Sequence, residues 1–162
     1  ASEEKAKIFS DQPIEITGIG QKTTSASFTK NILGEIESTR IAADLAYKMA
    51  KIEAKQIDVA EVHDAFSVCE LMAISELGLT SNEKSGEFVR DLFNTENRMI
   101  NPRGGLIGAG HPLGATGISQ TIEITNQLQG KSDKRQISNA KIGLIHNMSA
   151  AGTSSSIMVL KN

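Results

Sequence analysis

The stretch NPRGGLIGAGHPLGATGISQ, residues 101–120, places six glycines around a single histidine, His111. Glycine has no Cβ atom and tolerates positive φ, so this density predicts backbone that bends sharply and lets another group approach closely. Pro112 fixes its own φ angle and suits the first turn of a helix. The N-terminal end of a helix opposes positive charge, which favours the neutral imidazole that a base needs. The stretch therefore predicts a strained loop that holds His111 at the start of a helix.

The helix expected after this loop ends at Gly130, and its apolar residues follow helical spacing: Ile118, Ile122, Ile124 and Leu128. Two other interpretations of the loop compete with a catalytic one. His111 could serve packing alone, although so much unusual backbone exceeds what a packing side chain requires. Gly108, Gly110 and Gly114 could form a dinucleotide-binding turn, which requires GxGxxG spacing after a hydrophobic strand. The spacing here differs and the preceding residues make a poor strand, so we disfavour nucleotide binding.

Outward from the loop, the chain alternates between strand and helix patterns. Short apolar runs predict four strands: 14–20, 59–62, 142–145 and 157–160. Helical spacing predicts helices at 38–52 and 67–77, the first with Ser38 as its N-cap. We expect a loop over 21–37, and a turn with a short helix over 78–97. This order predicts one α/β domain with helices on both faces of a mixed sheet, whose last two strands pair antiparallel.

The segment HDAF, residues 63–66, directly follows the expected strand 59–62. Ligands bind outside the carboxyl ends of strands in open α/β sheets, so His63 and Asp64 are well placed for function. Each also has a structural interpretation. We expect Asp64 to cap the helix that begins at Ser67, and His63 could pack against that helix.

The amino-acid composition limits the classes of partner and ligand that we expect. The 17 basic and 19 acidic residues nearly balance, so nothing indicates a nucleic acid or an anionic membrane as partner. The single cysteine, Cys69, excludes an internal disulfide and a cysteine-built zinc site, and the three histidines lie in separate motifs without metal-ligand spacing, so we expect no metal. The sequence shows no apolar run of membrane-spanning length and no secretory signal, which makes a cytoplasmic location the default expectation.

The histidine loop resembles that of the thiolase superfamily, in its sterol-carrier-protein-2-type and archaeal branch. VAEVHDAFSVCELMA at 59–73 is similar to the HDxF segment of that branch. AKIGLIHNMSAAGTSSSIMVL at 140–160 is similar to its closing strand, glycine-rich loop and strand. The three segments follow the family's order and cover nearly the whole chain. The resemblance implies a layered thiolase α/β domain, in which residues 1–162 are the C-terminal half and the half that carries the nucleophilic cysteine is absent.

The resemblance also implies an activity, that of an acetyl-CoA acetyltransferase of lipid metabolism that acts on CoA thioesters, with coenzyme A as substrate and no bound cofactor. His111 matches the base for the nucleophile, and His63 matches the residue that holds the water of an oxyanion hole. Asn147, Ser149 and Gly110 match oxyanion and substrate-binding positions. This half alone is expected to be inactive. Its expected partners are the N-terminal half, a second copy in a dimer or larger homo-oligomer, and a small OB-fold protein.

One departure from the family pattern concerns the second cysteine. Classical thiolases carry it in the final loop, about where Asn147 stands, and the sterol-carrier branch often carries it within HDCF, where this chain has Ala65. Cys69 lies one helical turn further on the same face, and we interpret it as a buried, inert thiol. Two alternatives to a thiolase therefore stay open: a thiolase-fold retro-aldolase acting on CoA thioesters, and a non-catalytic subunit that binds a partner.

Overall fold

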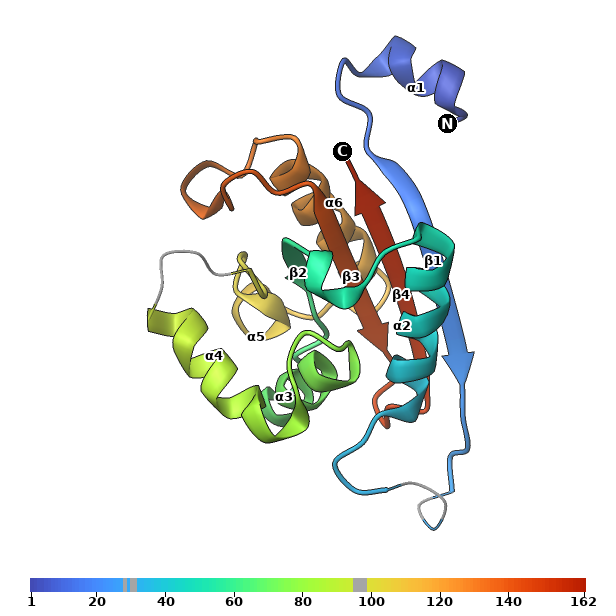
Figure 1. The fold of residues 1–162 in the computed structure, drawn as a ribbon, viewed down its shortest axis with the longest axis vertical. Coiled ribbons are helices and arrows are strands. Elements are labelled where there is room, and N and C mark those ends of the chain that lie inside the picture. The colour runs from blue at the N-terminus through green and yellow to red at the C-terminus, as the bar shows by residue number, and fades with distance from the viewer. Residues whose placement is uncertain (28, 30–31, 95–98) are drawn as a thin grey trace.

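The computed structural model describes residues 1–27, 29, 32–94 and 99–162, without the side chains of Asn82 and Phe93. Parts of two expected segments therefore lie outside the described residues, namely residues 28 and 30–31 of the loop over 21–37, and residues 95–97 of the segment 78–97. The rest of the chain forms a sheet flanked by helices (Figure 1).

The sheet has four strands in the order β1-β4-β3-β2. Their bounds are β1 (Glu15–Thr23), β2 (Val59–Glu61), β3 (Ile142–Met148) and β4 (Ser154–Lys161). β4 pairs antiparallel with both β1 and β3, whereas β2 and β3 are parallel. Beyond β2, Ile100 adds a single parallel bridge to Ala60. The expected mixed sheet with a final antiparallel pair is confirmed.

Six α-helices are described: α1 (Glu3–Phe9), α2 (Glu37–Ala50), α3 (Ser67–Glu76), α4 (Ser85–Asn94), α5 (Gly105–Ala109) and α6 (Thr116–Leu128). Three short 3₁₀ turns join them: η2 (Ala54–Gln56), η3 (Asn82–Lys84) and η4 (Asp133–Arg135). In Figure 1, α2 lies in front of the sheet and α6 behind it, while α1 stands apart and buries no residue. None of the described helices is long and apolar enough to cross a membrane.

The two faces of the sheet carry separate hydrophobic cores because strand side chains alternate. On β3 and β4, Leu144 and Val159 pack in the core that α2 covers. Their neighbours Ile145 and Leu160 pack in the core that α6 covers, together with Ile124 and Leu128 of that helix. Helices on both faces of the sheet are therefore confirmed.

The buried face of α2 differs from the sequence expectation. Leu45 and Met49, which set its apolar spacing, are 48% and 59% exposed, and the buried face consists mainly of alanines. The reason is close packing against β1, where a Cβ atom at Gly20 would collide with the carbonyl oxygen of Ala42. Ser38 is not the N-cap. It lies inside the first turn, and Ile36 occupies the cap position without a side-chain hydrogen bond.

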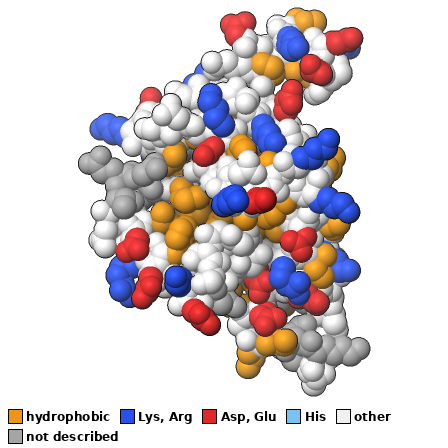
Figure 2. Space-filling view, in the orientation of Figure 1, with side chains coloured by type: hydrophobic (Ala, Val, Ile, Leu, Met, Phe, Trp, Pro, Cys, Tyr) orange, Lys and Arg blue, Asp and Glu red, His pale blue; other side chains and the backbone are white. Residues whose placement is uncertain are grey.

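The helix after the glycine loop forms as expected, but only half of its apolar residues face the core. Ile124 and Leu128 are buried, whereas Ile118 and Ile122 are 65% and 56% exposed. The helix ends at Leu128, and Gly130 follows its cap with φ of 71°. On the face shown in Figure 2, apolar side chains also reach the surface across the middle, with charges of both signs around them.

Candidate active site

A cleft of about 980 Å³ opens where the parallel strands β2 and β3 end. Its lining includes His63, which follows β2, Asn147, which is the penultimate residue of β3, and His111 from the glycine loop. The carboxyl ends of neighbouring parallel strands meet at one edge of a sheet, which explains why residues so distant in sequence share this cleft. Ala65, Cys69 and Ser149 also line it.

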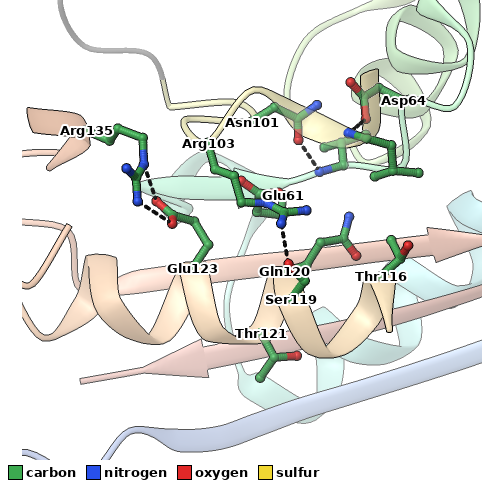
Figure 3. A network of polar contacts seen from close by, with 12 residues as sticks. Glu61, Asp64, Asn101, Arg103, Thr116, Ser119, Gln120, Thr121, Glu123 and Arg135 are labelled. Carbon is green, nitrogen blue, oxygen red and sulfur yellow. Dashed lines mark hydrogen bonds and ion pairs between the residues drawn. The ribbon is translucent and has the colours of Figure 1, made fainter. Parts of the chain in front are cut away.

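The rings of His63 and His111 lie edge to face, with centroids 4.9 Å apart and planes at 88°. Asp64 brings the two segments together, because its Oδ1 accepts the N–H of Leu106 at 2.6 Å in the first turn of α5 (Figure 3). Gly105 has φ of 63°, and a Cβ atom there would collide with the Asp64 carboxylate. The expectation that Asp64 caps the helix beginning at Ser67 is wrong. It caps α5, a helix that the sequence did not predict, and α3 has no side-chain cap.

The hydrogen bonds of His111 fix its tautomer. Its Nδ1 lies 2.7 Å from Thr116 Oγ1. The Thr116 hydroxyl donates to the carbonyl oxygen of Pro112 at 3.1 Å. A hydroxyl has one hydrogen, so its oxygen accepts from Nδ1–H of His111. The lone pair of the neutral ring is then on Nε2, where it can take a proton.

His63 is buried with 4% of its surface exposed. Burial lowers its pKa, and the nearby His111 lowers it further, while the hydrogen bond to Asn147 opposes both. The distance between His63 Nδ1 and Asn147 Oδ1 is 3.3 Å. Near neutral pH the ring is therefore uncharged, as a group that orients water by hydrogen bonding requires.

His146 is fully buried in β3, and burial lowers its pKa to about 3. Its Nδ1 accepts the backbone N–H of His63 at 3.4 Å, and its Nε2 lies 3.1 Å from Thr39 Oγ1. From Thr39 the hydrogen bonds continue through the hydroxyls of Ser155 and Ser38 to the carbonyl oxygen of Gly152. The third histidine thus joins the backbone of His63 to the final loop and has a structural role.

The final loop is shorter than the sequence suggested, because β3 continues through Met148 and leaves residues 149–153 to connect it to β4. Asn147 consequently lies on a strand. The N–H of Ser149 donates to the Ser154 carbonyl at 2.8 Å. Ala150 lines the cleft, and its N–H has no acceptor within the described part of the chain. Ala150 gives no signal of function in the sequence, since alanine carries no polar side chain.

Gly110 and Cys69 differ in their relation to the cleft. Gly110 ends α5, donates its N–H to the carbonyl oxygen of Leu106 at 2.9 Å, and is not among the described residues that line the cleft. Cys69 is partly exposed and lines it, which differs from the expected buried position. Burial raises the pKa of its thiol, which favours the protonated form. Among the described residues, no three His, Cys, Asp or Glu side chains gather as a metal site.

A charged network that the sequence analysis missed fixes the start of the glycine loop (Figure 3). Glu61 is fully buried in β2, and its Oε2 lies 3.4 Å from Nε of Arg103. Arg103 also donates to Ser119 Oγ in α6, and Glu123 of the same helix pairs with Arg135 at 3.0 Å. Burial raises the pKa of Glu61 to about 7 against the opposing effect of Arg103. A glutamate within an apolar strand was the available sequence signal.

A mixed sheet between two helical layers, with a glycine-loop histidine in edge-to-face contact with the histidine of HDAF in one cleft, defines a thiolase-type C-terminal domain. Residues 18–162 match the family described as "Thiolase C-terminal domain-like", and the chain belongs to this family.

The chain is also similar in sequence to two proteins of known name. The chain is 36% identical over 157 residues to an acetyl-CoA acetyltransferase of Methanothermobacter thermautotrophicus, covering 95% of this chain and 41% of that protein. It is 38% identical over 160 residues to sterol carrier protein 2 of Oryctolagus cuniculus, covering 94% and 29%. The chain therefore spans less than half the length of these relatives. A solved structure named "Ltp2-ChsH2(DUF35) aldolase" is similar in fold, with a TM-score of 0.78, 19% identity, and coverage of 92% of this chain and 39% of that one.

Proposed function

We propose that this chain is the C-terminal half of a thiolase-type acyltransferase acting on CoA thioesters. In this proposal His111 is the base for the nucleophile, and His63 holds a water in an oxyanion hole. The observation that carries it is the pair of histidine rings 4.9 Å apart in one cleft, one of them with a tautomer that leaves Nε2 free. The acetyl-CoA acetyltransferase relatives support the reaction class.

In this proposal the tautomer suits His111 to a proton-transfer step in acyl transfer. A cysteine of the N-terminal half would lose its proton to Nε2 of His111, and the thiolate would attack the thioester carbonyl. The C–S bond to CoA then breaks, and His111 returns the proton to the leaving thiolate. Hydrogen-bond donors must meet the oxyanion that forms on the way. A water bound to His63 would supply one, and the N–H of Ala150 lies in the same cleft as a further donor.

Condensation of two acyl groups requires a second acid/base, and neither Ala65 nor Asn147 can provide it. Cys69 lines the cleft, but its raised pKa disfavours the thiolate. Thiolysis of a β-ketoacyl-CoA, as the reverse reaction, needs the same acid/base to protonate the leaving carbanion. Acyl transfer is therefore the better supported step, and a histidine or a bound water would have to carry the second proton in either direction. The alternative is a thiolase-fold retro-aldolase, with histidines and water as proton carriers. The fold of the aldolase complex is compatible with it, and that complex includes a DUF35 component, in line with a partner protein such as the expected OB-fold protein.

The proposed N-terminal half would cover the exposed apolar surface beside the cleft. Ile118 and Ile122 of α6 are exposed, as are Leu113, Phe66 and Ile19 at the cleft. Exposed apolar side chains gathered around one cleft are typical of an interaction site. With that half supplying the nucleophile, residues 1–162 alone would be inactive. Assembly into homo-oligomers and a cytoplasmic location remain predictions from the sequence.

The test uses the full-length protein with acetoacetyl-CoA and free CoA, with thiolysis measured directly and an acyl adduct sought by mass spectrometry. His111→Ala is expected to reduce turnover by about 10²–10⁴-fold without unfolding the protein. Turnover that survives this substitution would remove His111 from the mechanism. An absence of both turnover and adduct in the unsubstituted protein would favour the aldolase or the binding subunit. An assay for cleavage of β-hydroxyacyl-CoA substrates would then distinguish these two, because only the aldolase would cleave them.

A further inference from the structure

We infer that Gln120 is a positioning residue for His63, because it fixes, through Asn147, which ring nitrogen of His63 carries the hydrogen. The catalytic consequence rests on the proposed function, whereas the tautomer itself does not. Gln120 lies on α6 with none of its surface exposed, and its described hydrogen bonds go to His146 and Asn147 rather than to His63.

The direction of the hydrogen bonds follows from one fixed acceptor. Gln120 Nε2 lies 3.5 Å from the carbonyl oxygen of His146, and a carbonyl oxygen only accepts. The amide nitrogen of Gln120 must face it, which turns Oε1 toward Asn147, where Oε1 accepts from Nδ2. Oδ1 of Asn147 is then turned toward His63 and requires a donor. His63 therefore carries its hydrogen on Nδ1 and a lone pair on Nε2.

Reversal of the chain of hydrogen bonds is unfavourable at every step. A His63 ring with its hydrogen on Nε2 would set the Nδ1 lone pair against Oδ1 of Asn147. Flipping the Asn147 amide would transfer the conflict to Gln120, and flipping Gln120 would set its oxygen against the His146 carbonyl. A buried polar group left without a partner is strongly unfavourable. The carbonyl of His146 cannot reverse, because it belongs to a strand in the middle of the sheet.

This tautomer is the one that the proposed oxyanion hole requires. With its lone pair on Nε2, His63 accepts one hydrogen of a water, and the second hydrogen of that water is free to donate to the thioester oxygen. With the hydrogen on Nε2, the ring would donate to the water and no longer accept from it. Gln120 thus sets the polarity of the water without touching it.

The test compares two glutamines of α6 in the full-length protein. Gln120→Leu removes both polar groups of the amide at similar volume. Gln127→Leu is the matched control, since Gln127 is 1% exposed and lies two turns further along the helix. The amide of Gln127 bonds to Glu123, Arg135 and Ile137, outside the cleft. Imidazole ¹⁵N spectra report the tautomer, and the signals of His63 are assigned by their loss in His63→Ala.

We expect only the Nδ1–H form of His63 in the unsubstituted protein and in Gln127→Leu, and a mixture of both tautomers in Gln120→Leu. Gln120→Glu should retain the Nδ1–H form, because a protonated glutamate donates to the His146 carbonyl and accepts from Asn147 as glutamine does. Gln120→Glu also tests the inference if Gln120→Leu fails to fold. An Nε2–H form in the unsubstituted protein, or the same tautomer in Gln120→Leu, would overturn the inference, as would a mixture in Gln120→Glu.

Activity gives a separate readout. In the thiolysis assay, Gln120→Leu is expected to lower kcat by about 10- to 100-fold while KM stays nearly unchanged, and Gln120→Glu is expected to restore most of the rate. An unchanged kcat alongside mixed tautomers would overturn the catalytic part of the inference. If no variant or parent protein turns over, the proposed function has failed, and the spectra still decide whether Gln120 sets the tautomer.

Discussion

Oδ1 of Asp64 accepts the backbone N–H of Leu106 at 2.6 Å, so the carboxylate next to His63 holds the helix that leads to His111. Asp64→Ala should therefore reduce both stability and turnover. We expect the free energy of unfolding to fall by about 1–2 kcal/mol, as for the loss of a helix cap. Denaturant unfolding and the thiolysis assay measure the two effects.

Asp58→Ala is the matched control for Asp64, because Oδ2 of Asp58 accepts the N–H groups of Lys141 and Ile142 at the opposite ends of β2 and β3 from the cleft. It should cost stability but leave the rate of thiolysis intact. Equal rate losses in both variants would show that Asp64 has no special influence on the histidine pair.

Thr116→Val should impair His111 without changing the shape of its surroundings. The substitution removes the hydroxyl that accepts from Nδ1–H at 2.7 Å, so the ring can rotate and exchange tautomers. We expect kcat to fall about 10- to 100-fold. Thr116→Ser keeps the hydroxyl and should retain most of the rate. Similar rates for the valine and serine variants would contradict the orienting role of Thr116.

Asn147→Asp should raise the pKa of His63, because a carboxylate beside the ring stabilises the imidazolium form. In the parent protein burial lowers the pKa of His63, which favours the neutral ring. The limb of the pH–rate profile that requires neutral His63 should therefore move to higher pH. Measurement of kcat/KM against pH checks this. A limb that stays in place would mean that the titration of another group controls the rate.

Glu61 predicts a dependence of stability on pH. Its pKa rises from 4.5 to about 7 on folding because it is buried. Below pH 4.5 the carboxyl is protonated in both states and its contribution is fully present. As pH rises from 4.5 to about 7, Glu61 ionises in the unfolded chain but stays protonated in the folded protein. The stabilising contribution, on the order of 3 kcal/mol, is lost over this range.

Glu61→Gln should remove this loss, so the difference in unfolding free energy between variant and parent should shift in favour of the variant between pH 4.5 and 7. Urea unfolding at several pH values measures it. Burial lowers the pKa of His146, so this residue reduces the stability of the folded protein as pH falls. His146 is present in both proteins, and its effect therefore cancels in the difference between them. Parallel pH curves would contradict the buried position of the ionisable Glu61.

Local signals explain which features the sequence predicted well. The glycine density of residues 101–120 and the apolar runs before HDAF and after Ala140 depend on nearby residues alone, and they led to the loop, the strands and the histidines of the cleft. Tertiary packing decided what the sequence did not reveal. Leu45 and Met49 face outward because Gly20 lets an alanine face approach.

The sequence did not predict the hydrogen-bond partner of Asp64 either. Leu106 lies 42 residues away, whereas the helix that begins at Ser67 is much nearer and was the more obvious helix for Asp64 to cap. The roles of His146 and Gln120 were not predicted for the same reason, because they depend on contacts between residues of the sheet and of α6 that are distant in the sequence. A histidine at a strand end has the same local signature whether it faces the cleft or the core.

The buried position of the His63 amide has a consequence for hydrogen exchange. Its N–H is donated to His146, a fully buried side chain, and solvent deuterium can replace it only when the core opens. The N–H of Ala150 lies on an exposed loop and has no acceptor within the described residues. Within one cleft, the His63 amide should therefore exchange on the time scale of global unfolding, and the Ala150 amide at nearly the rate of an unprotected amide.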